Sequence, residues 1–163
     1  MIFSAKNPGL WTVFMSESPA FPPFLDAFLV HWAQSLKDES PGILGRQFPN
    51  GSFEAWTGWL ALIERMGDSR FRFLIAGTKL IPRFNRNLTG CVLTDVDQEV
   101  LGNLEERIKR AVLLQTPVVE TVLAPHCHCK YIDLLFPLSG DEGMEDLILL
   151  ASCPDQAHLY HPQ

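Results

Sequence analysis

The sequence lacks a surplus of positive charge. Lysine and arginine together number 13 against 19 aspartate and glutamate residues, which gives a formal net charge of −6. Nucleic-acid surfaces need a concentrated basic patch to contact phosphates, so this balance predicts no nucleic-acid partner. Basic residues gather at only two places, which we expect to be solvated helix faces: Lys79, Arg83 and Arg86, and then Arg107, Lys109 and Arg110.

Long apolar runs are absent as well. No stretch reaches the roughly 18 apolar residues that a membrane-spanning helix needs, which predicts no membrane association. Near the start, Lys6 is followed by Pro8 and Gly9, so no apolar segment of a secretory signal forms. The cysteines number only four, and without an export signal they are expected to be reduced, with Cys91 and Cys153 as buried structural thiols. These features predict a cytoplasmic protein.

The sequence does contain enough apolar material for a core. Of its 163 residues, 47% are hydrophobic and 20% are charged, which is typical of a globular domain rather than a disordered chain. No internal repeat or linker divides it. We therefore expect an irregular N-terminal arm over residues 1–21, one domain over 22–154 and a C-terminal tail over 155–163.

Two segments show the spacing of amphipathic helices. Pro22-Pro23 begins the first, because proline suits the first helical turn, and its apolar stripe either faces the core or forms a dimer seam. That stripe consists of Leu25, Phe28, Leu29, Trp32 and Leu36. Asp95 and Gln98 resemble a capping pair before the second helix. Its apolar face comprises Leu101, Leu104, Ile108, Ala111 and Val112, and two acid–base pairs stand four residues apart, Glu105 with Lys109 and Glu106 with Arg110.

Strand patterns occupy the middle and the end of the chain. Residues 59–66 and 70–76, joined by a two-residue turn at Gly67-Asp68, predict a β-hairpin, and residues 79–84 predict one short helical turn. Three further strands are expected over 118–123, 131–138 and 146–153. Consecutive strands with short connections favour antiparallel pairing, so the fold class is α+β, with the central helices over one sheet face.

Three of these segments also resemble a known family. Arg70 to Thr78 (RFRFLIAGT), the helical turn after it, and Asn87-Leu88-Thr89-Gly90 are similar to a PAS-like family of small stand-alone proteins common in alphaproteobacteria. Phe136-Pro137-Leu138-Ser139 resembles that family's closing hairpin, and the likeness covers about residues 27–153. The resemblance implies a five-stranded antiparallel sheet with helices on one face and an extra N-terminal helix. It also implies a role in sensing or protein association, and it names no ligand or cofactor.

The residues that carry the resemblance also have a geometric explanation. Gly77 ends a strand where a side chain is not tolerated or where φ is positive, and the Thr78 hydroxyl is expected to cap the next turn. A direct ligand role for Thr78 or Arg83 is the alternative. Pro82, Asn85 and Asn87 depart from the family's pattern.

These features together predict a signalling domain that is not an enzyme. A small apolar ligand, or a signalling partner in trans, would fill space between the sheet and the central helix and shift the helix packing. The protein is expected to act as a homodimer. Alternation and helical phase select seven candidate lining residues: Phe73, Ile75, Leu80, Phe84, Leu104, Ile108 and Phe136. A ligand-free structural adaptor is a further possibility.

One segment suggests different chemistry. His126-Cys127-His128-Cys129 holds four possible metal ligands, but in an extended strand the histidines and the cysteines face opposite sides, so the four do not converge. We interpret it as the end of a strand and a turn. The alternative is a two-ligand surface site, completed by His158 or His161, in a metal-linked or small-molecule enzyme.

Overall fold

The computed structural model describes residues 23–35, 55–67, 69–114, 117–124, 127–138 and 147–155. The predicted arm at 1–21 lies outside these residues, as does all of the tail after Asp155. Among the described residues, no helix is long and apolar enough to cross a membrane.

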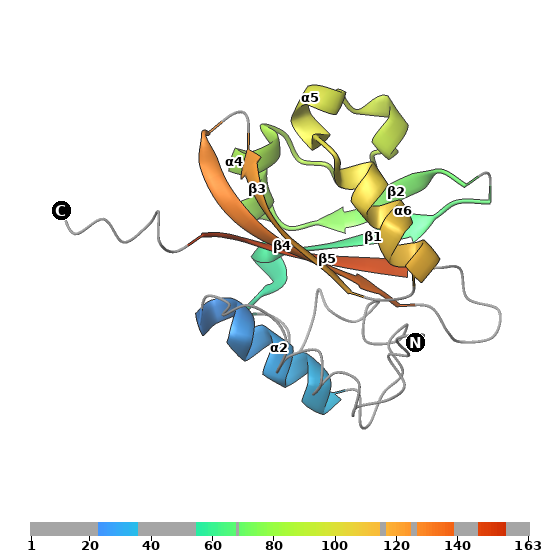
Figure 1. The fold of residues 1–163 in the computed structure, drawn as a ribbon. Helices are drawn as coiled ribbons and strands as arrows, with labels where there is room; N and C mark the ends of the chain where they lie inside the picture. The colour runs from blue at the N-terminus through green and yellow to red at the C-terminus, as the bar shows by residue number, and fades with distance from the viewer. Residues whose placement is uncertain are drawn as a thin grey trace.

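The described strands form one five-stranded antiparallel sheet in the order β2-β1-β5-β4-β3. Consecutive strands pair as hairpins at both edges, and β5 closes the sheet between β1 and β4 (Figure 1). The α+β class and the antiparallel sheet are therefore confirmed. The strands are β1 (Leu60–Arg65), β2 (Phe71–Ala76), β3 (Val118–Ala124), β4 (Cys129–Pro137) and β5 (Leu147–Pro154).

Helices cover both faces of this sheet. The connection from β2 to β3 contains α4, α5 and α6 and lies over one face, whereas α2 lies against the other (Figure 1). The helices are α2 (Pro23–Ser35), α4 (Ile81–Phe84), α5 (Gln98–Leu101) and α6 (Leu104–Leu114). Short 3-10 turns at Thr57–Trp59, Thr78–Leu80 and Leu93–Asp95 complete the described elements.

The sheet separates two apolar clusters. Under α2, Phe28 and Leu29 are buried against residues of β1, β4 and β5, and the Phe28 ring lies edge-on to Phe136 with centroids 6.3 Å apart. The α2 stripe therefore faces the core at these two positions. Under α4 to α6, the second cluster includes Phe73, Phe84 and Ile108. The central strands β1 and β5 contribute to both clusters, which explains their nearly continuous apolar sequence.

The predicted second helix is broken into α5 and α6. Gly102 has a φ of 62°, a left-handed conformation that ends α5 after one turn. The capping pair predicted at Asp95 and Gln98 is wrong, because Asp97 is the cap: its Oδ1 accepts a hydrogen bond of 2.9 Å from the Glu99 amide. The expected ion pair between Glu105 and Lys109 is present at 3.2 Å.

Residues 88–92 run along the outer edge of β2. The Gly90 amide donates to the Phe73 carbonyl at 2.7 Å, and the Phe73 amide donates to the Cys91 carbonyl at 2.9 Å. The Thr89 hydroxyl accepts a hydrogen bond of 2.9 Å from the Ala76 amide. The Leu88-Thr89-Gly90 segment therefore provides hydrogen-bond partners for backbone groups of the edge strand β2.

Gly77 is required by close packing, as one of its two explanations predicted. Its φ is −66°, and a Cβ built on it would overlap the carbonyl oxygen of Gly58. Thr78 does not cap the following turn: Gly77 occupies the cap position, and no side chain makes a capping hydrogen bond there. Thr78 is exposed instead.

Candidate functional site

Asp133 is a fully buried carboxylate in the middle of the sheet. It lies on β4 opposite Glu120 of β3 and opposite Ser152 of β5, so the three side chains share one face. Both neighbouring strands are hydrogen-bonded to β4, and the carboxylate points into the layer between the sheet and the helices. An ionised carboxylate in such a place needs partners, because burial of an isolated charge is very costly.

Two arginines from the helical layer supply those partners. Arg83 of α4 forms a bidentate pair with Asp133, in which Nη2 donates to Oδ2 at 2.7 Å and Nη1 donates to Oδ1. Arg83 Nη1 also donates to Ser152 Oγ at 2.6 Å. Arg107 of α6 donates from Nη1 to Asp133 Oδ2 at 2.8 Å. We call these four residues the Asp133 clamp, because one carboxylate joins α4 and α6 to the sheet.

The clamp corrects the prediction that both basic groups lie on solvated helix faces. Arg83 and Arg107 are only 4% and 2% exposed. The guanidinium of Arg83 lies over the rings of Phe84 and Tyr131, at 4.7 and 5.3 Å from their centroids. The one signal in the sequence was Asp133 itself, a charged residue inside an apolar strand, but nothing local to it identifies the two arginines.

The charges of the clamp set the protonation state of its carboxyl group. Burial alone would raise the pKa of Asp133, but the attraction and hydrogen bonds of Arg83, followed by those of Arg107, outweigh it and hold the pKa below its usual range. Asp133 is therefore ionised at neutral pH. Burial raises the pKa of Tyr131 to about 12, so its phenol is neutral beside Arg83.

A second carboxylate extends this cluster toward solvent. Glu120 Oε2 lies 3.6 Å from Arg107 Nε, and Glu120 also pairs with Arg110. Arg107 Nε donates its hydrogen bond to Asn103 Oδ1, at 2.9 Å. Asn103 immediately precedes α6, so this bond fixes the arginine to the first turn of its own helix.

A small pocket of about 60 Å³ opens beside the clamp. It lies between the α5–α6 junction and β3, and both arginines of the clamp line it. Apart from Asn103 and Gly102, its other lining residues are apolar. The lining residues are Arg83, Val100, Leu101, Gly102, Asn103, Arg107, Val122, Leu123 and Ala124.

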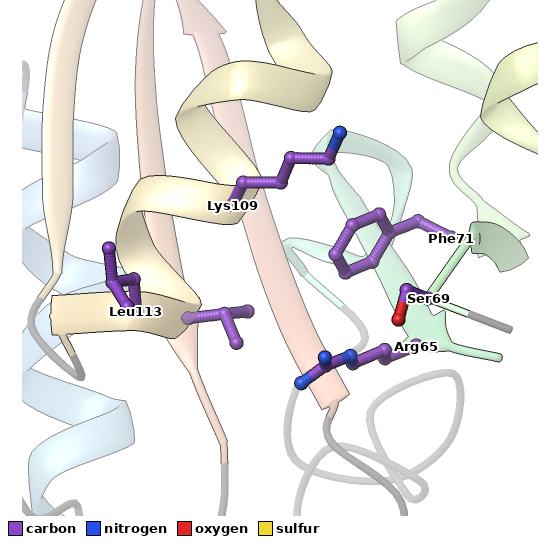
Figure 2. Close-up of a pocket in the computed structure, with 6 residues that line it drawn as sticks. Arg65, Ser69, Phe71, Lys109 and Leu113 are labelled. Atoms are coloured by element: carbon purple, nitrogen blue, oxygen red, sulfur yellow. The ribbon is translucent and has the colours of Figure 1, made fainter. Parts of the chain in front are cut away.

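A larger and more open groove of about 500 Å³ lies at the other end of α6. Figure 2 shows Lys109 and Leu113 of α6 on one side of it, and Arg65, Ser69 and Phe71 of the β1–β2 hairpin on the other. Val112 completes the lining. Leu113 is 82% exposed and so presents apolar surface to this groove. The lining of the groove therefore combines apolar side chains with cationic ones.

The seven predicted lining residues do not share one space. Five belong to the cluster beneath α4 to α6, where each is at least 99% buried: Phe73, Leu80, Phe84, Leu104 and Ile108. Ile75 and Phe136 pack in the cluster on the α2 face instead, so their assignment to the same layer is wrong. A register irregularity between Leu62 and Ile63 interrupts the β1–β2 pairing, and simple alternation along β2 does not foresee it. None of the seven lines either pocket described above.

The described part of the His-Cys segment consists of a turn at Cys127 and His128 followed by the first residue of β4, Cys129. Ala124 pairs with Cys129 across the hairpin, and His128 has a positive φ of 52°, which confirms the interpretation as a strand end and a turn. The Cys129 thiol donates to the Cys127 carbonyl at 3.2 Å. Within the described ranges no three His, Cys, Asp or Glu side chains are grouped as metal ligands. His126, His158 and His161 lie outside those ranges.

Comparison with known proteins adds one structural likeness. No family model and no curated protein matches the chain. The crystal structure of a domain of an HTR-like protein from Haloarcula marismortui is similar to part of it, with a TM-score of 0.45 and 19% sequence identity. The match covers 58% of this chain and 94% of that domain. A likeness of this size does not identify a fold.

Proposed function

We propose that this chain is a PAS-like sensory or protein-interaction domain that is not itself an enzyme and acts through association with a ligand or partner. The five-stranded antiparallel sheet with α4 to α6 over one face is the arrangement that the sequence resemblance implies. The observation that carries the proposal is the Asp133 clamp. It places one buried ionic contact between the sheet and two separate helical segments.

Such a contact suits a switch between two packings. A network of charges with directional hydrogen bonds favours a few discrete positions of the helices relative to the sheet, rather than a continuous range of positions. A ligand or partner that binds one arrangement of α4 and α6 better than another shifts the population toward it, and only that difference in affinity has an effect. A shift of α4 or α6 relative to the sheet would alter the energy of the ionic contacts that Arg83 and Arg107 make with Asp133 on β4.

The groove in Figure 2 is the surface that we assign to the partner or to an amphipathic ligand. Phe71, Val112 and Leu113 provide apolar area, and Arg65 and Lys109 provide positive charge at its margin. This assignment replaces the packed core positions selected from the sequence. A homodimer in the cytoplasm remains part of the proposal.

Native mass spectrometry of the purified, untagged protein tests the proposal. We expect either a dimer or a monomer that retains a small molecule. The Leu113→Gln variant should lose that association, whereas Val30→Gln, which changes a valine that is 45% exposed on α2, should keep it. A strictly monomeric wild-type protein with nothing bound would contradict the proposed function.

A further inference from the structure

Arg107 has more hydrogen-bond donors than the described residues satisfy. A guanidinium carries five N–H groups. Arg107 Nε donates to Asn103 and Nη1 donates to Asp133, but Nη2 makes no hydrogen bond to any residue that the structure describes. The side chain is 97% buried, but Nη2 is not one of the fully enclosed atoms that lack a partner among the described residues, so it borders accessible space. Arg107 lines the 60 Å³ pocket.

The charges of this cluster are also unbalanced. Three guanidinium groups, those of Arg83, Arg107 and Arg110, face two carboxylates, those of Asp133 and Glu120. The linked set therefore carries a net charge of +1 by this count. Arg110 is half exposed and partly screened by solvent, but the two arginines of the clamp are not. One further negative charge beside the clamp would balance the set.

The pocket has the size and lining for a small anion. A volume of about 60 Å³ admits about four or five atoms the size of water, since one such atom needs at least 10–15 Å³ by this measure. The first turn of α6 begins at its wall, and backbone N–H groups of a first turn favour negative charge. Val122 and Ala124 on the opposite wall are apolar and suit a methyl group or a flat face.

We propose that this pocket binds a small monovalent oxyanion, such as a short-chain carboxylate or nitrate, through the guanidinium groups of Arg107 and Arg83. The planar fork of arginine matches the paired oxygens of such an anion. The inference rests on the proposed sensory function, to which it adds a small-anion ligand at a site separate from the groove assigned to the partner or amphipathic ligand. Binding adds a second negative partner to Arg107 and thereby weakens or reorients its bond to Asp133. The anion would then act on the contact that holds α6 to β4.

A titration of isotopically labelled protein followed by NMR tests the site. Sodium acetate, nitrate and phosphate are each added at constant ionic strength, with sodium chloride as the reference salt. We expect saturable shifts of the Arg107 and Arg83 Nε–Hε signals and of the amides of 100–107. The dissociation constant for the preferred monovalent oxyanion should be on the order of 1 mM, as expected for a ligand of about four heavy atoms.

The salt that produces saturable shifts identifies the chemical class of the anion that the pocket binds. Saturation by acetate supports an organic carboxylate, and saturation by nitrate alone supports an inorganic anion. A preference for phosphate, shifts equal to those in chloride, or shifts that do not saturate would overturn the proposal.

A pocket-filling variant avoids the clamp itself. Val122→Phe places a larger side chain in the pocket and should abolish the saturable shifts, whereas Thr121→Phe, on the opposite face of the same strand, should retain them. Retention of the shifts in Val122→Phe would also overturn the assigned site. If the wild-type protein binds no oxyanion yet forms a dimer or retains another molecule in native mass spectrometry, the anion proposal fails while the proposed function stands.

Discussion

Arg107 Nη1 donates a hydrogen bond of 2.8 Å to Asp133 Oδ2 and so joins α6 to β4. The same oxygen accepts a bond of 2.7 Å from Arg83 of α4. Two helical segments, which the Leu93–Asp95 turn and α5 separate along the chain, therefore depend on one carboxylate. Because all three groups are buried, the loss of the carboxylate charge leaves two guanidinium groups without their counter-charge.

Asp133→Asn should lower the free energy of unfolding by about 3–5 kcal/mol, the usual cost of leaving buried charges unpaired. The change keeps the shape of the side chain, removes its charge and replaces one acceptor oxygen with an NH2 donor that faces the arginines. Urea denaturation at neutral pH measures the effect. The matched control is Glu105→Gln, which removes the ion pair with half-exposed Lys109 and should cost about 0.5 kcal/mol or less. A cost for Asp133→Asn as small as that of the control would show that the clamp contributes little to stability.

The clamp should also make stability depend on pH at the acid end. The pKa of Asp133 is lower in the folded protein than in the unfolded chain, so the unfolded state binds its proton more readily. The stabilisation is complete above the unfolded value of about 3.9 and is lost as the pH falls through the lower, folded value. The difference in unfolding free energy between wild type and Asp133→Asn should be constant from about pH 7 to pH 5. It should shrink below about pH 4, and a difference that persists unchanged to about pH 3 would contradict this.

Two glycine-to-alanine substitutions should distinguish a glycine that close packing requires from one whose replacement only reduces the freedom of the unfolded backbone. Gly77→Ala brings a Cβ against the backbone of Gly58 and Thr57, and should lower the unfolding free energy by about 1–3 kcal/mol. Gly67→Ala meets no atom within 4 Å in the hairpin loop and should be neutral or slightly stabilising. Thermal unfolding of both variants measures the contrast. Equal effects would mean that the contact at Gly77 relaxes without cost.

Much of the fold follows from local pattern, whereas the clamp does not. Period-two alternation located the strands, and helical spacing located α2 and α6. The break at Gly102 was missed because the apolar face continues from Leu101 to Leu104 across it. The burial of Arg83 and Arg107 depends on a carboxylate 50 and 26 residues away in sequence. The sequence around each arginine does not indicate that partner, because the same local pattern is compatible with an arginine that faces solvent and with one that pairs with a buried aspartate.

The cysteines allow a separate check of the core. Cys153 is buried, as the sequence predicted, and burial followed by the nearby Asp133 and Asp155 carboxylates raises the pKa of its thiol to about 12. In folded protein at about pH 7.5, N-ethylmaleimide should label half-buried Cys127 and leave Cys153 unmodified. After unfolding in urea both should react, as peptide mass spectrometry can show. Rapid labelling of Cys153 in the folded protein would indicate that this core opens readily.

Amide hydrogen exchange of the wild type and of Asp133→Asn tests most directly whether the clamp couples the helical layer to the sheet. Under conditions in which both proteins are folded, the account predicts that α4 and α6 lose protection together in the variant, while the β1–β5 pairing at the centre of the sheet keeps its protection. Unchanged protection in both helices, or a loss confined to one of them, would contradict the coupling on which the proposed function depends.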